Sequence, residues 1–151
     1  MIIIDRVWRE DEPGPAAAGF VEDTITLDWE ARQKGHARRR TDQGIEFATS
    51  LPQGTMLREG DRLRLDPLRR IVTVREAQDE VYVIRPRTAR EWAWLAYQIG
   101  NRHQPLMIAE EELICPRTPD VEQLLQQLGV ALTAAQRPFT PAIARVGHHH
   151  E

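Results

Sequence analysis

The hydrophobic residues of this chain change their periodicity about halfway along, and that change limits the possible folds. In the first half, apolar residues alternate with polar ones, so that Ile25 and Leu27 would share one face of a strand. In the second half they recur three and four positions apart, as in Trp92, Leu95 and Ile99. Alternation is typical of half-buried strands, and the longer spacing is typical of amphipathic helices. The sequence therefore predicts two domains, a small all-β domain followed by an α+β domain.

The first domain is predicted to span residues 1–76 and to be built from short strands and turns. Isoleucine and valine over residues 2–8, and strict alternation from Asp23 to Trp29, indicate strands. The turn Asp42-Gln43-Gly44, with apolar residues after it, predicts a hairpin. Further strands are expected between the turns at residues 51–54 and 58–61, over residues 63–65 and over residues 71–74.

The second domain is predicted to span residues 77–140, with the order β-α-β-β-α-β of the ferredoxin-like plan. Thr88 is the expected N-cap of a helix that runs through Ile99, and Thr118 precedes a proline at the first position of a second helix. Both helices would cover one face of a single sheet, and residues 141–151 would form a flexible tail. Strands are expected over residues 81–84, 106–108, 113–115 and 130–134.

Composition and charge exclude several classes of partner. The chain of 151 residues has a formal net charge of -3 and a pI near 6.0, which gives no general attraction to nucleic acid or anionic membrane. No apolar run is long enough to cross a bilayer, and the first residues become charged too soon for a secretory signal. The single cysteine, Cys115, excludes an internal disulfide and is compatible with a reducing cytoplasm, which is the predicted location.

The α+β plan is common among RNA-binding modules, which stack bases on aromatic residues of their central strands. The corresponding strand here, Leu113-Ile114-Cys115, is aliphatic and follows Glu110-Glu111-Glu112, so no nucleic-acid partner is predicted. The run Arg38-Arg39-Arg40 is taken as the only cationic cluster. It is interpreted as the solvated face of a hairpin, and a docking patch for an acidic partner is the alternative.

The sequence carries no recognisable catalytic signature. It has neither a Gly-x-Ser-x-Gly nucleophile elbow nor a glycine-rich phosphate loop. Cys115 lies inside a predicted strand, where a buried thiol is normally inert. Carboxylates are plentiful, but without a fold-level pairing none can be assigned as general acid or base. No enzyme is therefore predicted.

The histidines remain as candidates for chemistry. His103 lies just beyond the expected end of the first helix, where Gly100 or Asn101 would supply the left-handed residue. Metal binding is one interpretation, and stabilisation by the helix dipole, about 0.3–1 kcal/mol, is the other. One imidazole is too few ligands for a stable metal site. A two-fold dimer would answer this objection by bringing two copies of His103 to one axis.

The cluster His148-His149-His150 lies near the end of the chain. As part of a flexible tail it would supply further metal ligands, whereas the remnant of a purification tag is the alternative. His36, beside basic residues at a strand edge, is interpreted as an ordinary surface residue.

Several segments together resemble UreE-type urease accessory proteins, and the resemblance covers nearly the whole chain in order. The most specific is Ala96-Tyr97-Gln98-Ile99-Gly100-Asn101-Arg102-His103-Gln104-Pro105. The others are Asp23-Thr24-Ile25-Thr26-Leu27-Asp28-Trp29-Glu30, Arg40-Thr41-Asp42-Gln43-Gly44, Leu51-Pro52-Gln53-Gly54-Thr55 and Leu57-Arg58-Glu59-Gly60-Asp61.

This resemblance implies a nickel metallochaperone, a homodimer that binds Ni(II) and supplies it to apo-urease through other accessory proteins, including a GTPase. The N-terminal β domain of that family resembles a peptide-binding module, and the C-terminal ferredoxin-like domain dimerises and binds the metal. The family's metal-binding histidine falls on His103, and its terminal histidines correspond in kind to His148, His149 and His150. Imidazoles also suit Zn(II) and Cu(II), which are expected to substitute for nickel in vitro.

The chain departs from the family pattern at one place. Some members carry two more histidines just before the second helix of this domain, where this chain has Arg117 and Pro119. Neither side chain is a metal ligand, so binding would depend on His103 and the tail. Two other functions remain open: a peptide-binding or protein-binding adaptor whose histidines are incidental, and a hydrolytic metalloenzyme, for which no general base can be assigned near His103.

Overall fold

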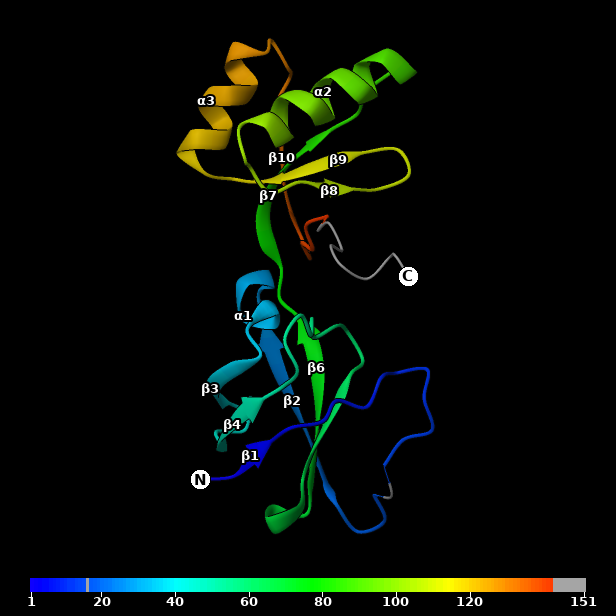
Figure 1. Ribbon diagram of the computed structural model, residues 1–151, viewed down its shortest axis with the longest axis vertical. Helices are drawn as coiled ribbons and strands as arrows, with labels where there is room; N and C mark the ends of the chain where they lie inside the picture. Colours follow the sequence, from blue (N-terminus) through cyan, green and yellow to red (C-terminus); the bar gives the residue numbers. More distant parts are fainter. Residues whose placement is uncertain (16, 143–151) are drawn as a thin grey trace. The chain divides into compact units, whose positions relative to one another are not determined.

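The computed structural model describes residues 1–15 and 17–142. The chain divides into two compact units, Met1–Ala77 and Gln78–Glu151, and each has its own hydrophobic core (Figure 1). Within the described residues, no helix is both long enough and apolar enough to cross a membrane.

The first unit contains two three-stranded sheets and is mostly β, as predicted. In one sheet β1 pairs in parallel with β4, and β4 pairs antiparallel with β3. In the other, β2 pairs in parallel with β6, and β6 pairs antiparallel with β5. The elements are β1 (Ile3–Ile4), β2 (Val21–Leu27), α1 (Trp29–Gln33), β3 (His36–Arg40), β4 (Glu46–Ser50), β5 (Arg62–Leu65), the 3-10 turn η1 (Asp66–Leu68) and β6 (Arg70–Glu76).

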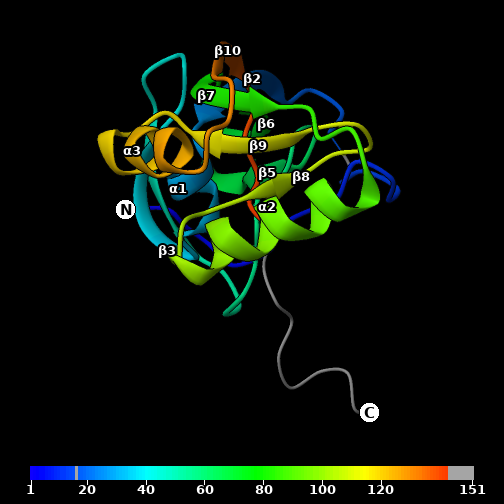
Figure 2. The same ribbon diagram turned by 90° about the horizontal axis from the view of Figure 1, so that it is seen from above.

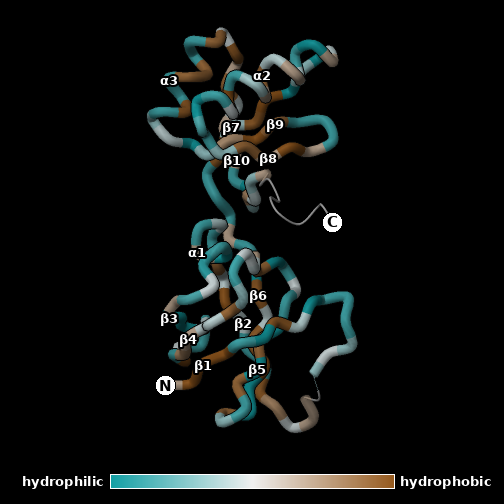
Figure 3. The backbone as a smooth tube through the Cα atoms, in the orientation of Figure 1, coloured by the Kyte–Doolittle hydropathy of each residue, from teal (hydrophilic) through white to brown (hydrophobic). Residues whose placement is uncertain are grey.

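The core of the first unit is formed by the inward residues of both sheets, and Figure 3 shows hydrophobic stretches along several of these strands. Alternation is clearest in β5, where Leu63 and Leu65 are buried and the alternating Arg62 and Arg64 are not. The same two-residue period predicted this strand from the sequence. The buried cluster comprises Ile4, Ile25, Phe47, Leu51, Leu57, Leu63, Leu65, Val72 and Val74.

Three details of the first unit differ from the prediction. The strand expected over residues 2–8 is reduced to β1, and Trp8 forms only an isolated bridge with Arg62. Trp29 does not extend β2, because the Asp28 carboxylate accepts the N–H of Ala31 (2.8 Å) and starts α1. No strand forms between the turns at residues 51–54 and 58–61. The backbone N–H of Leu57 donates to the carbonyl of Arg32 in α1 and not to a neighbouring strand.

The arginine run lies in β3, where neighbouring side chains point to opposite faces. Arg38 and Arg40 are exposed, as expected for alternate residues on the outer face of a hairpin. Arg39 is buried, and its guanidinium donates to the Oγ1 of Thr49 (3.0 Å) and to the carbonyls of Ala31 (3.0 Å) and Lys34. Desolvation lowers the pKa of Arg39. The middle arginine therefore joins the hairpin to α1.

The second unit has the predicted order β-α-β-β-α-β. Its four strands form one antiparallel sheet in the order β10-β7-β9-β8 (Figure 2), so β8 and β10 are the outer strands. Both helices lie on one face of this sheet (Figure 1). The elements are β7 (Asp79–Ile84), α2 (Ala89–Asn101), β8 (Met107–Ile108), β9 (Leu113–Pro116), α3 (Pro119–Gln127) and β10 (Thr133–Arg137).

The starts of both helices agree with the sequence. Thr88 caps α2 by accepting the N–H of Glu91 at its hydroxyl (3.1 Å), and Thr118 caps α3 through the N–H of Val121 (3.3 Å). Their apolar sides pack on Tyr82, Ile84, Leu113 and Cys115 of the sheet. A short polar side chain at this position satisfies a helix N–H group that has no partner within the helix.

The last strand begins three residues later than expected. Gly129 has a φ of 73°, and the N–H of Val130 bonds back to the carbonyl of Leu125 (3.0 Å), so the residues after α3 first complete its end. Val130 and Leu132 then pack against the helix-side core instead of pairing within the sheet. Their apolar character arises from this packing and not from a strand.

Candidate metal site

His103 lies directly beyond α2 and is exposed. Its N–H donates to the carbonyl of Gly100 (2.9 Å), and the N–H of Gln104 donates to the carbonyl of Ile99 (3.3 Å). These two bonds form a Schellman motif, in which the residue after the C-cap adopts the left-handed conformation. The cap residue is Arg102, so the left-handed position falls on His103. The backbone of the candidate ligand is thus fixed by two hydrogen bonds.

The expectation that Gly100 or Asn101 would supply the left-handed residue is wrong. Both belong to α2, and His103 itself has a φ of 56°. The reason is that the helix continues for two residues past Ile99 before the chain turns. A Cβ atom makes this conformation unfavourable, typically by about 1–2 kcal/mol, although histidine tolerates it better than most residues. Such strain at an exposed imidazole is typical of functional positions.

The end of the described chain lies close to the histidine loop. Phe139 is fully buried, and the N–H of Ala142 donates to the carbonyl of Leu106 (2.7 Å), three residues after His103. The predicted ligands His148, His149 and His150 lie outside the described residues.

Besides His103, the described residues contain one further histidine, His36, and one cysteine, Cys115. Burial of Cys115 in β9 raises the pKa of its thiol to about 12, so it stays protonated and is no metal ligand at neutral pH. His36 is exposed at the start of β3 in the other unit. Across residues 1–15 and 17–142, no three His, Cys, Asp or Glu side chains form a group suited to a metal ion. A site at His103 therefore needs ligands from a second chain or from outside the described residues.

Arg117 and Pro119, which stand where some UreE-type proteins carry additional histidines, have structural roles. Arg117 pairs with Glu80 (3.7 Å) and lies over the ring of Tyr82 (5.8 Å), whereas Pro119 is the first residue of α3. The Tyr82 hydroxyl in turn donates to the carboxylate of Glu122 (2.8 Å). These contacts join α3 to the sheet, and neither Arg117 nor Pro119 can serve as a metal ligand.

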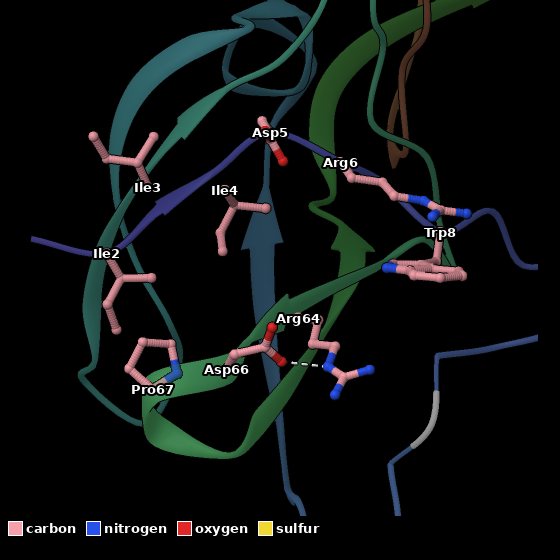
Figure 4. Close-up of a pocket in the computed structure, with 9 residues that line it drawn as sticks. All are labelled: Ile2, Ile3, Ile4, Asp5, Arg6, Trp8, Arg64, Asp66 and Pro67. Carbon is pink, nitrogen blue, oxygen red and sulfur yellow. Dashed lines mark hydrogen bonds and ion pairs between the residues drawn. The ribbon is translucent and has the colours of Figure 1, made fainter.

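The first unit has a groove of about 420 Å³ between β1 and the end of β5 (Figure 4). Trp8, which lines the groove, exchanges both backbone hydrogen bonds with Arg62 (2.9 and 2.8 Å). The groove lies farther along these segments, where it is lined by residues such as Ile3 and Arg64. Arg6 stacks on the Trp8 ring at 3.5 Å. The groove thus combines apolar side chains with two outer strand edges.

Sequence reasoning missed this groove and also a second cationic group. Arg85, Arg87 and Arg90 lie within six residues at the start of α2 and are all exposed. The signal was present in the sequence, but a search for consecutive basic residues found only Arg38-Arg39-Arg40. The groove left no signal, because it depends on two segments more than fifty residues apart in the sequence.

Comparison with known proteins agrees with the order of the two units. Residues 4–75 match the model of the UreE urease accessory protein N-terminal domain, and residues 79–151 match that of the C-terminal domain. A urease accessory protein UreE of Chelativorans sp. is 39% identical over 134 residues, covering 85% of this chain and 84% of that protein. A urease accessory protein UreE of Lysinibacillus sphaericus is 35% identical over 148 residues, covering 98% of this chain and 97% of that protein.

These matches extend over both units and most of the length of each relative. UreE accessory proteins are non-enzymatic chaperones that take part in urease maturation, which agrees with the prediction that the chain is not an enzyme. The chain belongs to the family of UreE urease accessory proteins.

Proposed function

We propose that this protein is a nickel metallochaperone, which binds Ni(II) at His103 and delivers it to apo-urease while the urease active site is assembled. Membership of the UreE family supports a role in urease maturation. The observation that carries the metal role is the exposed, left-handed His103, whose backbone is fixed by the end of α2. The metal is a cargo, so a site with few rigid ligands favours its release by ligand exchange.

A homodimer would double the number of rigid imidazoles at this site. Two large apolar side chains near His103 are left in water: Tyr97 on α2 is 65% exposed, and Ile108 on the outer strand β8 is 57% exposed. Tyr97 lies six residues before His103 and Ile108 five residues after it. Exposed apolar groups on both sides of the loop favour association of two copies there, which would place the two His103 side chains together.

The tail is long enough to supply the remaining ligands. Leu106, to which Ala142 is hydrogen-bonded, is at most about 11 Å along the chain from His103. The six residues from Ala142 to His148 extend to about 20 Å. The imidazoles of His148, His149 and His150 can therefore reach His103 of the same chain. Ligands on such a tail can leave one at a time, which suits transfer to a partner.

The remaining parts of the proposal concern partners and place of action. The partners are a second copy of the chain, apo-urease and other urease accessory proteins including a GTPase, and the location is the cytoplasm. The groove between β1 and β5 supports partner binding by the first unit, because an extended peptide can add to a free strand edge. Zn(II) and Cu(II) are expected to compete for the same imidazoles in vitro.

Calorimetric titration with nickel is expected to give one high-affinity metal ion per two chains. Tyr97→Glu would place a charge in the proposed dimer contact and is expected to weaken dimerisation roughly tenfold. High-affinity nickel binding should weaken with it, since each chain then offers only one rigid imidazole. The oligomeric state is measured by analytical ultracentrifugation on the same samples.

Leu68→Glu is the matched control for that variant. Leu68 is also a large exposed hydrophobic residue, 45% exposed, but it lies in the first unit. The change should leave both dimer and nickel stoichiometry as in the wild type. A Tyr97→Glu protein that remains a full dimer would contradict the proposed contact.

Deletion of residues 147–151 is expected to reduce nickel affinity at least tenfold while the dimer is retained. The hydrogen bond of Ala142 anchors the chain near His103, so the tail imidazoles would act at high local concentration. The deletion removes these imidazoles and with them their contribution to nickel affinity. Calorimetry and ultracentrifugation together check both parts. Loss of the dimer instead would mean that the tail is structural and that the assigned division of roles is wrong.

The adaptor function is the alternative, and the groove of the first unit is the observation that favours it. In that case the first unit recognises a peptide and the histidines are incidental. A titration without saturable nickel binding would reject the metallochaperone and leave the adaptor.

A further inference from the structure

The second unit has a hollow of about 400 Å³ at the start of α2, away from the His103 end of that helix. It lies among the end of β7, the first turns of α2 and the segment that follows α3. We call it the α2 hollow. The residues that matter below are its two arginines, its acidic residue and its apolar wall, namely Arg85, Arg87, Glu91, Trp94, Leu128 and Val130.

The wall of the α2 hollow is apolar and only partly covered. Trp94 is 46% exposed although it lies in the middle of α2, and Leu128 and Val130 are only partly buried against the core. Covering the exposed part of an indole ring is favourable, and tryptophan is enriched where proteins bind one another. The centre of the occupant is therefore apolar.

The rim carries guanidinium groups, two of which make no ion pair within the described residues. Arg85 is paired with Glu112 (2.6 Å), which also holds Arg137, and the Glu91 carboxylate accepts the backbone N–H of Arg87 (2.6 Å). Within residues 1–15 and 17–142, the guanidinium groups of Arg87 and Arg90 have no hydrogen bond or ion pair. Arg90 is one helical turn before Trp94 and so lies on the same side of α2. Two free guanidinium groups beside an apolar wall favour an occupant with carboxylates.

We propose that the α2 hollow binds a segment of a partner protein in which apolar side chains are flanked by aspartate or glutamate. The apolar side chains cover Trp94 while the carboxylates pair with Arg87 and Arg90. Guanidinium groups match carboxylates in charge and in the geometry of paired hydrogen bonds. An apolar centre with a charged rim is the usual arrangement of a protein interface, whereas a small-molecule site has precisely placed polar groups inside it.

The probe is a labelled octapeptide of two leucines between two runs of three aspartates, capped at both ends. Fluorescence anisotropy with the full-length protein is expected to show saturable binding that weakens as salt is raised. Trp94→Ala should weaken it about tenfold. The double variant Arg87→Gln with Arg90→Gln should weaken it about fivefold at low salt and remove most of the salt dependence.

Matched controls separate this site from general charge and from the metal site. Arg102→Gln removes an exposed arginine at the other end of α2 and should leave peptide binding unchanged. A peptide with lysine in place of aspartate should not bind. Nickel binding by the double variant should equal that of the wild type, so failure of this proposal is distinguishable from failure of the metallochaperone function.

Three results would overturn the proposal: no saturable binding of the acidic peptide, equal binding of the lysine peptide, or wild-type affinity in both the Trp94 and the arginine variants. If circular dichroism shows that Trp94→Ala is not folded, Ala131→Glu takes its place. Ala131 is exposed and lines the α2 hollow. A carboxylate there should lower the affinity for the acidic peptide at least fivefold by charge repulsion, and the substitution removes no packed side chain.

Discussion

His103→Gly is expected to abolish high-affinity nickel binding and, at the same time, to raise the melting temperature. Loss of an outer-shell partner alone costs about 10–100-fold in metal affinity, so loss of a ligand should cost more than about 100-fold. Glycine relieves the strain of a φ of 56°. Part of that gain is offset by the greater freedom of glycine in the unfolded chain, which leaves about 0.5–1 kcal/mol of added stability. Calorimetry and thermal unfolding measure the two effects.

His103→Ala separates the ligand from the backbone. Alanine removes the imidazole but keeps Cβ, so nickel affinity should fall as it does with glycine while the stability gain is absent. Asparagine, which tolerates the left-handed conformation, should give a stability close to that of the wild type. Unchanged high-affinity nickel binding in His103→Ala would reject the metal site outright. A glycine variant less stable than the alanine variant would show that the loop is not strained.

Arg39→Met is expected to destabilise the first unit by about 2–4 kcal/mol. Methionine keeps much of the buried volume, but it leaves the carbonyls of Ala31 and Lys34 without their guanidinium donor. Both carbonyls lie at the end of α1, so the contact between that helix and the β3–β4 hairpin should loosen. Urea denaturation of the full chain, followed by circular dichroism, measures the loss.

Arg38→Met is the matched control in the neighbouring position. Arg38 points to solvent from the other face of β3, and its replacement should change stability by no more than about 0.5 kcal/mol. Equal losses in the two variants would contradict the assignment of Arg39 alone as the joining residue. The comparison also tests which side chains of β3 face inward. If the strand were shifted by one residue, Arg38 would be buried instead of Arg39 and the two stability losses would be exchanged.

Local signals in the sequence were reliable where the physics is local. Thr88 is predicted as an N-cap and Thr118 as the residue that opens the second helix, and in both a side-chain oxygen bonds to an N–H only three residues away. The proline after Thr118 and the apolar spacing of α3 are signals of equally short range. The β-α-β-β-α-β order follows from such signals taken in sequence, and several distinct motifs in the same order as in UreE proteins indicate the family.

Signals that depend on distant partners were less reliable. The alternating start of the chain suggested a strand over residues 2–8, but only Ile3 and Ile4 find a partner in β4. Apolar residues 130–134 suggested a strand, yet Val130 and Leu132 are apolar because they cover the helix-side core. A strand exists only when another segment supplies hydrogen bonds, and a single alternating run does not specify that segment.

The sequence by itself determined the two-unit order, the helices with their caps, the family and the candidate ligand His103. Only the tertiary structure decided that this histidine, and neither Gly100 nor Asn101, adopts the left-handed conformation, and that the chain at Ala142 lies beside its loop. It also decided that Arg39 is buried between two exposed arginines, and it formed the groove at β1 and the α2 hollow. Capping and periodicity act over three or four residues, whereas these features depend on contacts between segments that the sequence does not pair.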